Sequence, residues 1–263
     1  MSASVPATQA LTHRHALVTG ASRGIGAAIA RALAAAGASI TLLGRDLPAL
    51  EGVAASIDGP KRIEVCDLSD PEQIASAFAE AASAFGPISI LVNNAGVAPS
   101  APFGKVSLAD WTKVLSVDLT AAFLACQQVA PAMRVAKWGR IINIASTAGL
   151  TGYRYVAPYV AAKHGLVGLT RALALETAKD GITVNAICPG FADTEIVAKA
   201  VSTIAEKSGR SAEEAKAEFV KSNPQGRLID PQEVADLVVY LCGEAARSMT
   251  GQALTIDGGE VLK

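Results

Sequence analysis

The stretch T-G-A-S-R-G-I-G, from Thr19 to Gly26, ends an apolar run and opens an alanine-rich helical segment. Three glycines at a strand-to-helix junction let the backbone turn tightly and approach a pyrophosphate, which the amides at the helix N-terminus attract. The spacing is G-x-x-x-G-x-G rather than G-x-G-x-x-G, and the G-K-[ST] of a P-loop is absent. A glycine trio can be a simple turn, but its place between a first strand and a first helix favours a dinucleotide-binding loop.

The rest of the chain alternates short apolar runs with helical segments. We expect strands at 16–19, 39–43, 62–66, 88–92, 140–145, 182–187 and 253–256. We expect helices at 24–36, 47–56, 71–85, 108–135, 153–179, 195–221 and 231–241, with an exposed interruption S-G-R-S (208–211) in the sixth. Such alternation indicates right-handed βαβ units and a parallel sheet covered on both faces. The prediction is an α/β protein with one Rossmann-type, doubly wound, seven-stranded sheet.

A chain of 263 residues can bury one core of this size as a single domain. Residues 1–13 begin with small and polar side chains, and we expect them to form a disordered leader. The remaining residues, 14–263, then form the Rossmann-type domain. Within it the polar segment 191–222 lies between a strand and the last helix, and we expect it to be a mobile substrate lid.

Composition excludes several classes of function. The formal net charge is -1 and no Lys/Arg-rich run exists, which argues against nucleic acid as a partner. No stretch of eighteen apolar residues lacks a charge, which argues against a membrane span. The three histidines form no ligand pair with a nearby acid, so we expect no metal site. The cysteines are scattered without a C-x-x-C motif, as is typical of reduced thiols in the cytoplasm: Cys66, Cys126, Cys188 and Cys242.

The segment from Tyr153 to Gly168 carries the most chemistry. Tyr159 and Lys163 stand four residues apart, so on a helix their side chains share one face. A phenol is a poor acid at neutral pH, and a neighbouring ammonium favours the phenolate. The pair could therefore give or take a proton near pH 7. The alternative is a half-buried aromatic ring beside a solvated lysine.

The end of the second predicted strand bears on the choice of dinucleotide. NAD-binding proteins usually place an acid there for the ribose 2′-hydroxyl, and this chain has Gly44 followed by Arg45. Arg45 and Arg23 could clamp a 2′-phosphate, so the sequence favours NADP(H). NAD(H) remains possible if both arginines are solvated and Asp46 holds the ribose. After the third strand, Asp67 could accept from the adenine amine or could simply cap a helix.

Motifs throughout the chain resemble those of the short-chain dehydrogenase/reductase family, and the match extends from His15 onward. It rests on T-G-A-S-R-G-I-G (19–26), D-L (67–68), N-N-A-G (93–96), Ser146, Y-V-A-A-K (159–163), N-A-I-C-P-G (185–190), Thr194 and D-G-G (257–259). The resemblance implies hydride transfer between a nicotinamide and a carbonyl or secondary alcohol. It also implies a homotetramer, or a homodimer, in which helices 108–135 and 153–179 pack against a second subunit.

The resemblance further implies roles for single residues. Tyr159 would be the acid/base, Ser146 would bind the substrate oxygen, and Lys163 would favour the phenolate and hold the nicotinamide ribose. Asn93 would tie adjacent strands together. The cofactor would be bound by Gly20, Ser22, Arg23, Gly24, Ile25, Gly26, Arg45, Asp67, Leu68, Asn94, Ala95, Gly96, Tyr159, Lys163, Pro189, Gly190 and Thr194. Among these, Gly96 would leave room for the cofactor.

One position departs from the family pattern. The family usually has an asparagine in the fourth helix that completes a proton relay to the lysine, and this chain has Asp118. An aspartate accepts hydrogen bonds but cannot donate as an amide does. We expect Asp118 to keep the relay and to favour the charged form of Lys163. The alternative is that the helix main chain does this work.

The substrate is less clearly indicated. The predicted lid resembles those of 3-hydroxyacyl-thioester and 3-hydroxybutyrate dehydrogenases and of 3-oxoacyl reductases. Reductases that use acyl carrier protein usually carry basic residues where this chain has Pro131 and Leu175. This favours a 3-oxoacyl or 3-hydroxyacyl-CoA, or a related small substrate. The alternatives are another secondary alcohol (3-hydroxybutyrate, a polyol, a cyclic alcohol) or a nucleotide-binding protein without catalysis.

Overall fold

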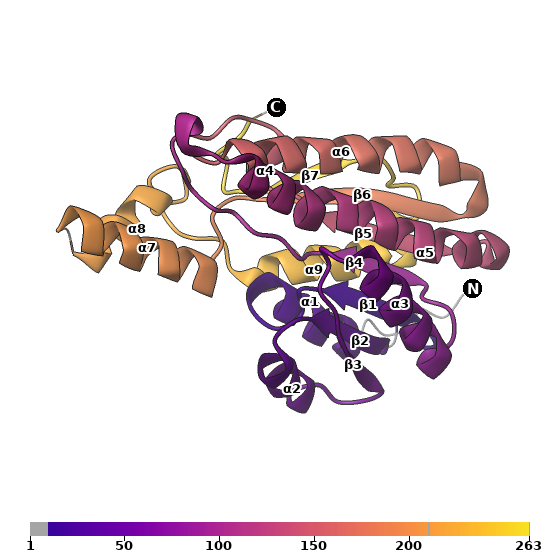
Figure 1. The fold of residues 1–263 in the computed structure, drawn as a ribbon. Helices are drawn as coiled ribbons and strands as arrows, with labels where there is room; N and C mark the ends of the chain where they lie inside the picture. Colours follow the sequence, from indigo (N-terminus) through magenta and orange to yellow (C-terminus); the bar gives the residue numbers. More distant parts are fainter. Residues whose placement is uncertain (1–9, 210, 263) are drawn as a thin grey trace.

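The computed structural model describes residues 10–209 and 211–262, and the sheet within them confirms the predicted architecture (Figure 1). Seven parallel strands are hydrogen-bonded in the order β3-β2-β1-β4-β5-β6-β7. They are β1 (His15–Thr19), β2 (Ser39–Gly44), β3 (Lys61–Val65), β4 (Ile90–Asn93), β5 (Gly139–Ile144), β6 (Ile182–Pro189) and β7 (Ala253–Ile256). Every residue of β1, β4, β5 and β6 is buried, as expected for strands covered on both faces.

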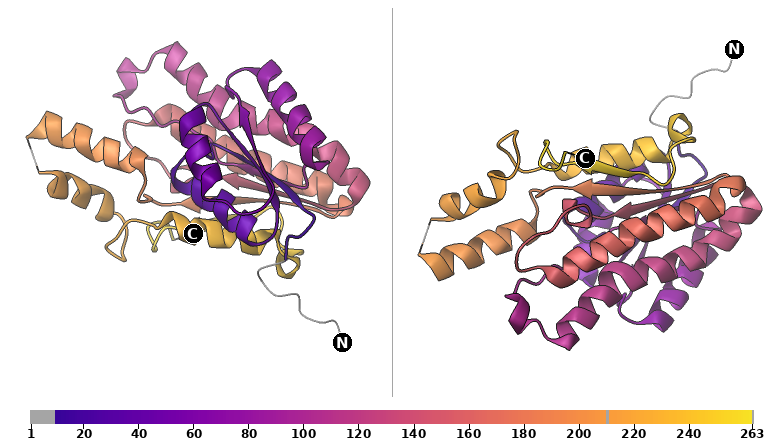
Figure 2. Two further views of the ribbon diagram at one scale, coloured as in Figure 1. Left: turned by 90° about the horizontal axis from the view of Figure 1, so that it is seen from below. Right: turned by 90° about the horizontal axis from the view of Figure 1, so that it is seen from above.

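Helices cover both faces of the sheet because alternate strand residues point to opposite sides. One face packs against α1 (Gly24–Ala35), α2 (Leu47–Ala55) and α9 (Pro231–Cys242). The other face packs against α3 (Pro71–Phe85), α5 (Ala121–Ala136) and α6 (Ala157–Thr177), and α4 (Leu108–Leu115) packs against α6. In β1, Ala16 and Val18 belong to the first core and Leu17 to the second. The fold is therefore doubly wound (Figure 2).

The expected disordered leader is shorter than predicted. Residues 1–9 lie outside the described residues, but 10–13 form a turn whose Leu11 belongs to the core. Leu11 is 1% exposed, and its amide donates to the Ala36 carbonyl oxygen over 2.9 Å. The prediction was wrong for 10–13 because one buried leucine in a polar stretch has no periodicity to reveal it.

The expected single helix at 108–135 is interrupted. Between α4 and α5, the residues Ser116–Thr120 form a π-helical turn. Such turns are frequent at functional sites. This one carries Asp118, which is 1% exposed. The interruption thus lies at the one position where the chain departs from the family pattern.

The α4–α5 region also has the length and composition of a membrane span, over Leu108–Ala136 with a mean hydropathy of 1.3. In the fold its inner residues pack on the second sheet face and against α6. A core helix passes the same length and composition test, so the observation is weak evidence for a membrane.

The expected helix at 153–179 begins later, at Ala157, because Pro158 stands at its first turn and Tyr155 before it has a φ of 68°. The expected helical segment 195–221 consists of two helices, α7 (Glu195–Ser208) and α8 (Ala212–Val220). Gly209, with a φ of 70°, ends α7, and residue 210 lies outside the described residues. The two helices project from the body of the molecule in every view (Figures 1 and 2).

Candidate active site

The candidate site lies where the strand order reverses. β1 pairs with β2 on one side and with β4 on the other, so the loops after β1 and β4 leave the sheet in opposite directions. In open α/β sheets this point at the carboxyl ends of the strands is where ligands bind. The predicted glycine loop follows β1, the N-N-A-G segment follows β4, and Ser146 follows β5.

The glycine loop is closely packed against the loop that follows β4. Gly20 has a φ of 64°, and the Asn94 side-chain amide donates to the carbonyl oxygens of Thr19 over 3.0 Å and Gly20 over 3.1 Å. A Cβ on Gly26 would overlap both the Gly20 carbonyl oxygen and the Asn94 amide. No side chain caps the N-terminus of α1 at Arg23, so its amides are available to phosphate oxygens. These features fit a dinucleotide pyrophosphate.

The substitution Gly26→Ala tests this packing. Its methyl group has to push apart the glycine loop and Asn94, so we expect cofactor affinity to fall at least about tenfold and stability to fall by about 2 kcal/mol. Titration of nicotinamide fluorescence and urea unfolding measure the two effects. Gly52→Ala in α2 is the matched control, because a Cβ there meets nothing within 4 Å. Equal behaviour of the two variants would contradict the packing argument.

The structure brings Ser146, Tyr159 and Lys163 to one end of β5 and α6. Lys163 is 3% exposed; its Nζ lies 5.4 Å from the centre of the Tyr159 ring and donates to the Ile144 carbonyl oxygen over 3.0 Å. Ser146 Oγ accepts from the Ala148 amide over 3.1 Å, a bond that leaves the hydroxyl hydrogen available. Tyr159 is half-buried. The lysine is therefore buried and held in place rather than solvated, against the alternative reading of the Tyr159–Lys163 pair.

Asp118 reaches this group from the π-helical turn. Its Oδ1 accepts from the Val97 amide over 2.8 Å, and its Oδ2 lies 3.7 Å from Lys163 Nζ, an ion pair beyond hydrogen-bonding distance. Oδ2 is buried and has no hydrogen-bond partner among the described residues. Burial raises the pKa of Asp118, and the Lys163 ammonium opposes that shift. A buried acceptor without a hydrogen-bond partner is rare in folded proteins, so this oxygen is a candidate to accept from a polar group that binds beside the pair.

Gly96 lies beside the pair formed by Asp118 and Lys163. A Cβ at this position would lie 2.9 Å from Asp118 Oδ2 and 3.4 Å from Lys163 Nζ. The missing side chain thus makes room for the ion pair, and the room for the cofactor stays a prediction of the family resemblance. The prediction for Asn93 is confirmed: its amide donates to Asn143 Oδ1 over 2.8 Å and ties β4 to β5.

The charged residues at the nucleotide end are paired and not simply solvated. Arg23 contacts Asp46 over 3.0 Å and Glu195 over 2.9 Å. Arg45 lies 3.9 Å from Asp67, with both side chains more than a third exposed. The structure therefore brings both arginines and Asp46 to the carboxyl ends of β1 and β2.

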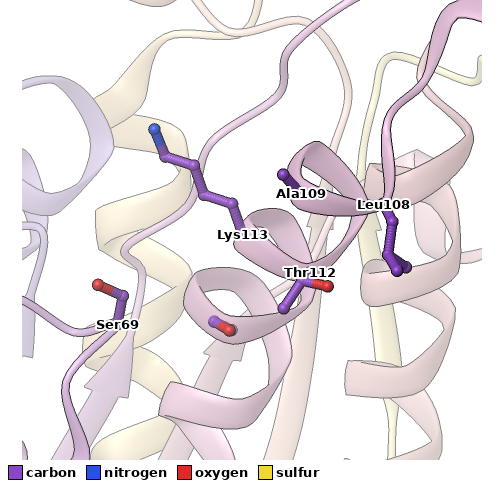
Figure 3. A pocket seen from close by; sticks show the side chains of 6 residues that line it. Ser69, Leu108, Ala109, Thr112 and Lys113 are labelled. Atoms are coloured by element: carbon purple, nitrogen blue, oxygen red, sulfur yellow. The ribbon is translucent and has the colours of Figure 1, made fainter.

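Asp67 is not a helix cap. Its Oδ1 accepts from the amide and hydroxyl of Ser69, bonds that lower the pKa of Asp67, whereas Asp70 caps α3. The adjacent Leu68 is 8% exposed. Ser69 also lines a surface hollow beside α4, into which the Lys113 side chain extends (Figure 3). The hollow lies beside the nucleotide end of the site. Ser146, Tyr159 and Lys163 are not among the residues that line it.

The residues after β6 bring the start of α7 onto the glycine loop. The Thr194 methyl group would lie 3.1 Å from a Cβ on Gly24. A Cβ on Gly190 would lie 3.0 Å from the Glu260 carboxylate. Two of the predicted cofactor-binding residues after β6 therefore contact segments that are distant in sequence. Gly190 lies beside Glu260 and Thr194 lies beside Gly24. The third predicted residue is Pro189.

A polar group around Tyr153 was not predicted from the sequence. The Tyr153 hydroxyl is 2.6 Å from Glu260 Oε1 and 2.8 Å from Thr147 Oγ1, so it donates to the carboxylate and accepts from the threonine. Its ring packs edge-on against Phe191, which packs edge-on against Phe219 of α8. Burial and the Glu260 carboxylate raise the pKa of Tyr153. Tyr153 thus connects the C-terminal tail with Thr147, the residue after Ser146, and through Phe191 with α8.

The substitution Tyr153→Phe keeps the ring and removes the hydroxyl. Glu260 Oε2 is buried and already lacks a partner, so the carboxylate would lose its remaining side-chain donor and we expect stability to fall by about 2 kcal/mol. We expect KM to rise more than kcat falls, because the lid contact is affected rather than Tyr159. Urea unfolding and steady-state kinetics check this. In the double variant Tyr153→Phe/Glu260→Met, no unpaired carboxylate remains and most of the stability should return.

Comparisons with known proteins agree with this geometry. The profile of a family described as Enoyl-(Acyl carrier protein) reductase matches residues 20–260. A D-beta-hydroxybutyrate dehydrogenase from Cupriavidus necator is 42% identical over 257 residues, covering 96% of this chain and all of that protein. A granaticin polyketide synthase putative ketoacyl reductase from Streptomyces violaceoruber is 43% identical over 253 residues, covering 93% of this chain and 92% of that protein.

Among solved structures, a variant of actinorhodin polyketide ketoreductase with NADPH superposes with a TM-score of 0.87 at 38% identity, covering 94% of this chain and 97% of that one. Levodione reductase gives a TM-score of 0.89 at 33% identity, covering 95% and 98%. The chain therefore belongs to the short-chain dehydrogenase/reductase family and is an NAD(P)-dependent oxidoreductase that transfers a hydride between a nicotinamide and a carbonyl or secondary alcohol.

Proposed function

We propose that the protein interconverts a small 3-oxoacyl compound and its 3-hydroxyacyl counterpart, with NADP(H) as the preferred cofactor. One observation carries the proposal. The Lys163 ammonium is buried beside the Tyr159 ring, 5.4 Å from its centre, at the end of β5 that also holds Ser146. A phenol, a hydroxyl and a buried ammonium at one strand end suit proton transfer to a carbonyl oxygen.

The proposed mechanism assigns one task to each side chain. The nicotinamide, when bound, supplies or accepts the hydride. During reduction, negative charge grows on the substrate oxygen, which the Ser146 hydroxyl stabilises by donating a hydrogen bond. Tyr159 gives its proton to that oxygen, and Lys163 stabilises the phenolate that remains. Asp118, 3.7 Å from Lys163 Nζ, favours the charged form of that lysine and completes the proton relay.

The proposed cofactor site extends along the carboxyl ends of β1 to β4. The loop from Gly20 to Gly26 would hold the pyrophosphate, Asp67 the adenine amine, and Lys163 the nicotinamide ribose. Arg23 and Arg45 would contact a 2′-phosphate. Two observations support NADP(H): the similar actinorhodin ketoreductase structure contains NADPH, and this chain has no acid at Gly44.

The proposed substrate is a CoA thioester or a smaller relative such as 3-hydroxybutyrate. Two relatives at 42% and 40% identity are D-beta-hydroxybutyrate dehydrogenases, and a third at 38% is a 3-oxoacyl-[acyl-carrier-protein] reductase. Pro131 in α5 and Leu175 in α6 stand where carrier-protein reductases usually have basic residues, and Leu175 is 83% exposed. This supports CoA over the acidic carrier protein. We further propose that 191–222 is the substrate lid.

The proposal includes a homotetramer, or a homodimer, in the cytoplasm. Large apolar side chains are exposed on the layer formed by α4, α5 and α6, which suits the expected contact with a second subunit: Leu108, Phe123, Val135 and Leu175. All four cysteines are free and buried, as expected in a reducing compartment. Size-exclusion chromatography with light scattering measures the assembly.

A panel of carbonyl substrates, each assayed with NADPH and NADH, tests the proposal. We expect acetoacetyl-CoA and acetoacetate to be reduced faster than cyclic ketones, and kcat/KM with NADPH to exceed that with NADH. Activity only on cyclic ketones or polyols would favour the alternative that the protein is a dehydrogenase of another secondary alcohol. Cofactor binding without turnover of any substrate would favour a non-catalytic protein.

A further inference from the structure

Arg23 in the glycine loop is shared by two carboxylates from distant parts of the chain. Its Nη2 lies 3.0 Å from Asp46, the N-cap of α2, and its Nη1 lies 2.9 Å from Glu195, the first residue of α7. Glu195 is 172 residues from Arg23 in sequence. The neighbouring Thr194 methyl group lies over Gly24 in the same loop. The base of α7 therefore rests on the glycine loop through two consecutive residues.

This arrangement affects the two dinucleotides differently. A 2′-phosphate needs the guanidinium donors of Arg23, and both terminal nitrogens already contact carboxylates. The two carboxylates and one guanidinium have a combined charge of about -1, which repels a phosphate and leaves the neutral ribose diol of NAD(H) unaffected. Asp46 can accept from that diol. The ion pair with Glu195 thus weakens the binding of NADP(H) and has little effect on the binding of NAD(H).

We propose that Glu195 is a specificity-determining residue for the cofactor and that a 2′-phosphate displaces it from Arg23, releasing the first turn of α7. The inference rests on the proposed function, in which Arg23 faces the 2′-phosphate. Binding energy at Arg23 and the position of α7 are then coupled, and such coupling is reciprocal. The base of the lid is held more firmly with NAD(H) bound than with NADP(H).

Glu195→Gln removes the charge and keeps the side-chain shape. We expect the Kd of NADPH, measured by nicotinamide fluorescence without substrate, to fall about fivefold at low ionic strength. The Kd of NADH should change by less than about twofold, and the gain for NADPH should shrink at about 0.5 M salt. Glu213→Gln, which removes the same charge from α8, is the matched control and should leave both constants unchanged. Equal gains for NADPH and NADH, or none, would overturn the proposal.

Arg23→Gln separates failure of this inference from failure of the proposed function. We expect it to weaken NADPH binding and to abolish the effect of Glu195→Gln in the double variant. If Arg23→Gln leaves NADPH affinity intact, the proposed place of the 2′-phosphate is wrong and the inference falls with it. If it weakens NADPH binding but Glu195→Gln has no effect, only the role of Glu195 is refuted. Limited proteolysis of α7 is the second readout: cleavage should be faster with NADPH bound than with NADH bound.

Discussion

Tyr159→Phe is expected to lower kcat about a thousandfold, because it removes the proton that the proposed mechanism delivers to the substrate oxygen. The ring remains, so its contact with the Lys163 ammonium and the half-buried packing at the start of α6 persist. We therefore expect unfolding by urea and the Kd of NADPH to change little. Single-turnover reduction of acetoacetyl-CoA, followed by NADPH fluorescence, measures the chemical step directly.

Tyr155→Phe is the matched control for this experiment. Tyr155 is 58% exposed and lies just before the helix that carries Tyr159. Loss of one hydroxyl there should leave kcat within about twofold of the original protein, as is usual for surface substitutions. Turnover that survives in Tyr159→Phe would remove the phenol from the mechanism, whatever the substrate proves to be.

The sequence was informative where local pattern and chemistry coincide. Short apolar runs separated by helical segments predict the seven strands, and the glycine spacing at 19–26 predicts the turn into α1. Tyr159 and Lys163 could be paired because a helix places residues four apart on one face. Ser146 could be added only through the family resemblance, since nothing in its neighbourhood distinguishes it from another serine at a strand end.

The parts that the sequence did not reveal depend on contacts between distant residues. The family resemblance linked Asp118 to Lys163, but the π-helical turn that carries Asp118 and its bond to Val97 are not visible in the periodicity of 108–135. Tyr153 and Glu260 are 107 residues apart. Arg23 was identified as a candidate phosphate ligand, but the carboxylate of Glu195 that competes for it enters only through the tertiary fold.

Asp118→Ala is expected to be the most destabilising single change in the site. It leaves the Lys163 ammonium, 3% exposed, without its charge partner and opens a cavity beside Gly96. Removing one member of a buried ion pair typically costs about 3 to 5 kcal/mol. Urea unfolding measures this loss. A cost below about 1 kcal/mol would mean that Lys163 finds another partner, and that the pair contributes little to the fold.

Asp118→Asn separates the charge of this residue from its shape. The amide oxygen can still accept from the Val97 amide, so the π-helical turn should persist. Without the carboxylate, the proposed proton relay lacks one member, so the pH profile of kcat should change. An unchanged profile would mean that the carboxylate has no part in the proton path and that the helix main chain suffices.

Stability gives an independent readout of the same carboxylate. Because burial raises the pKa of Asp118, the folded protein holds this proton to higher pH than the unfolded chain does. The group's contribution to stability is therefore fully present below the ordinary carboxyl pKa of about 4 and is lost as pH rises through the raised value. The asparagine of Asp118→Asn does not titrate. As pH rises from about 4 through the raised pKa of Asp118, the free energy of unfolding of this variant should therefore increase relative to that of the original protein. A difference independent of pH would show that Asp118 ionises as easily in the folded protein as in the unfolded chain, and that Lys163 fully offsets its burial.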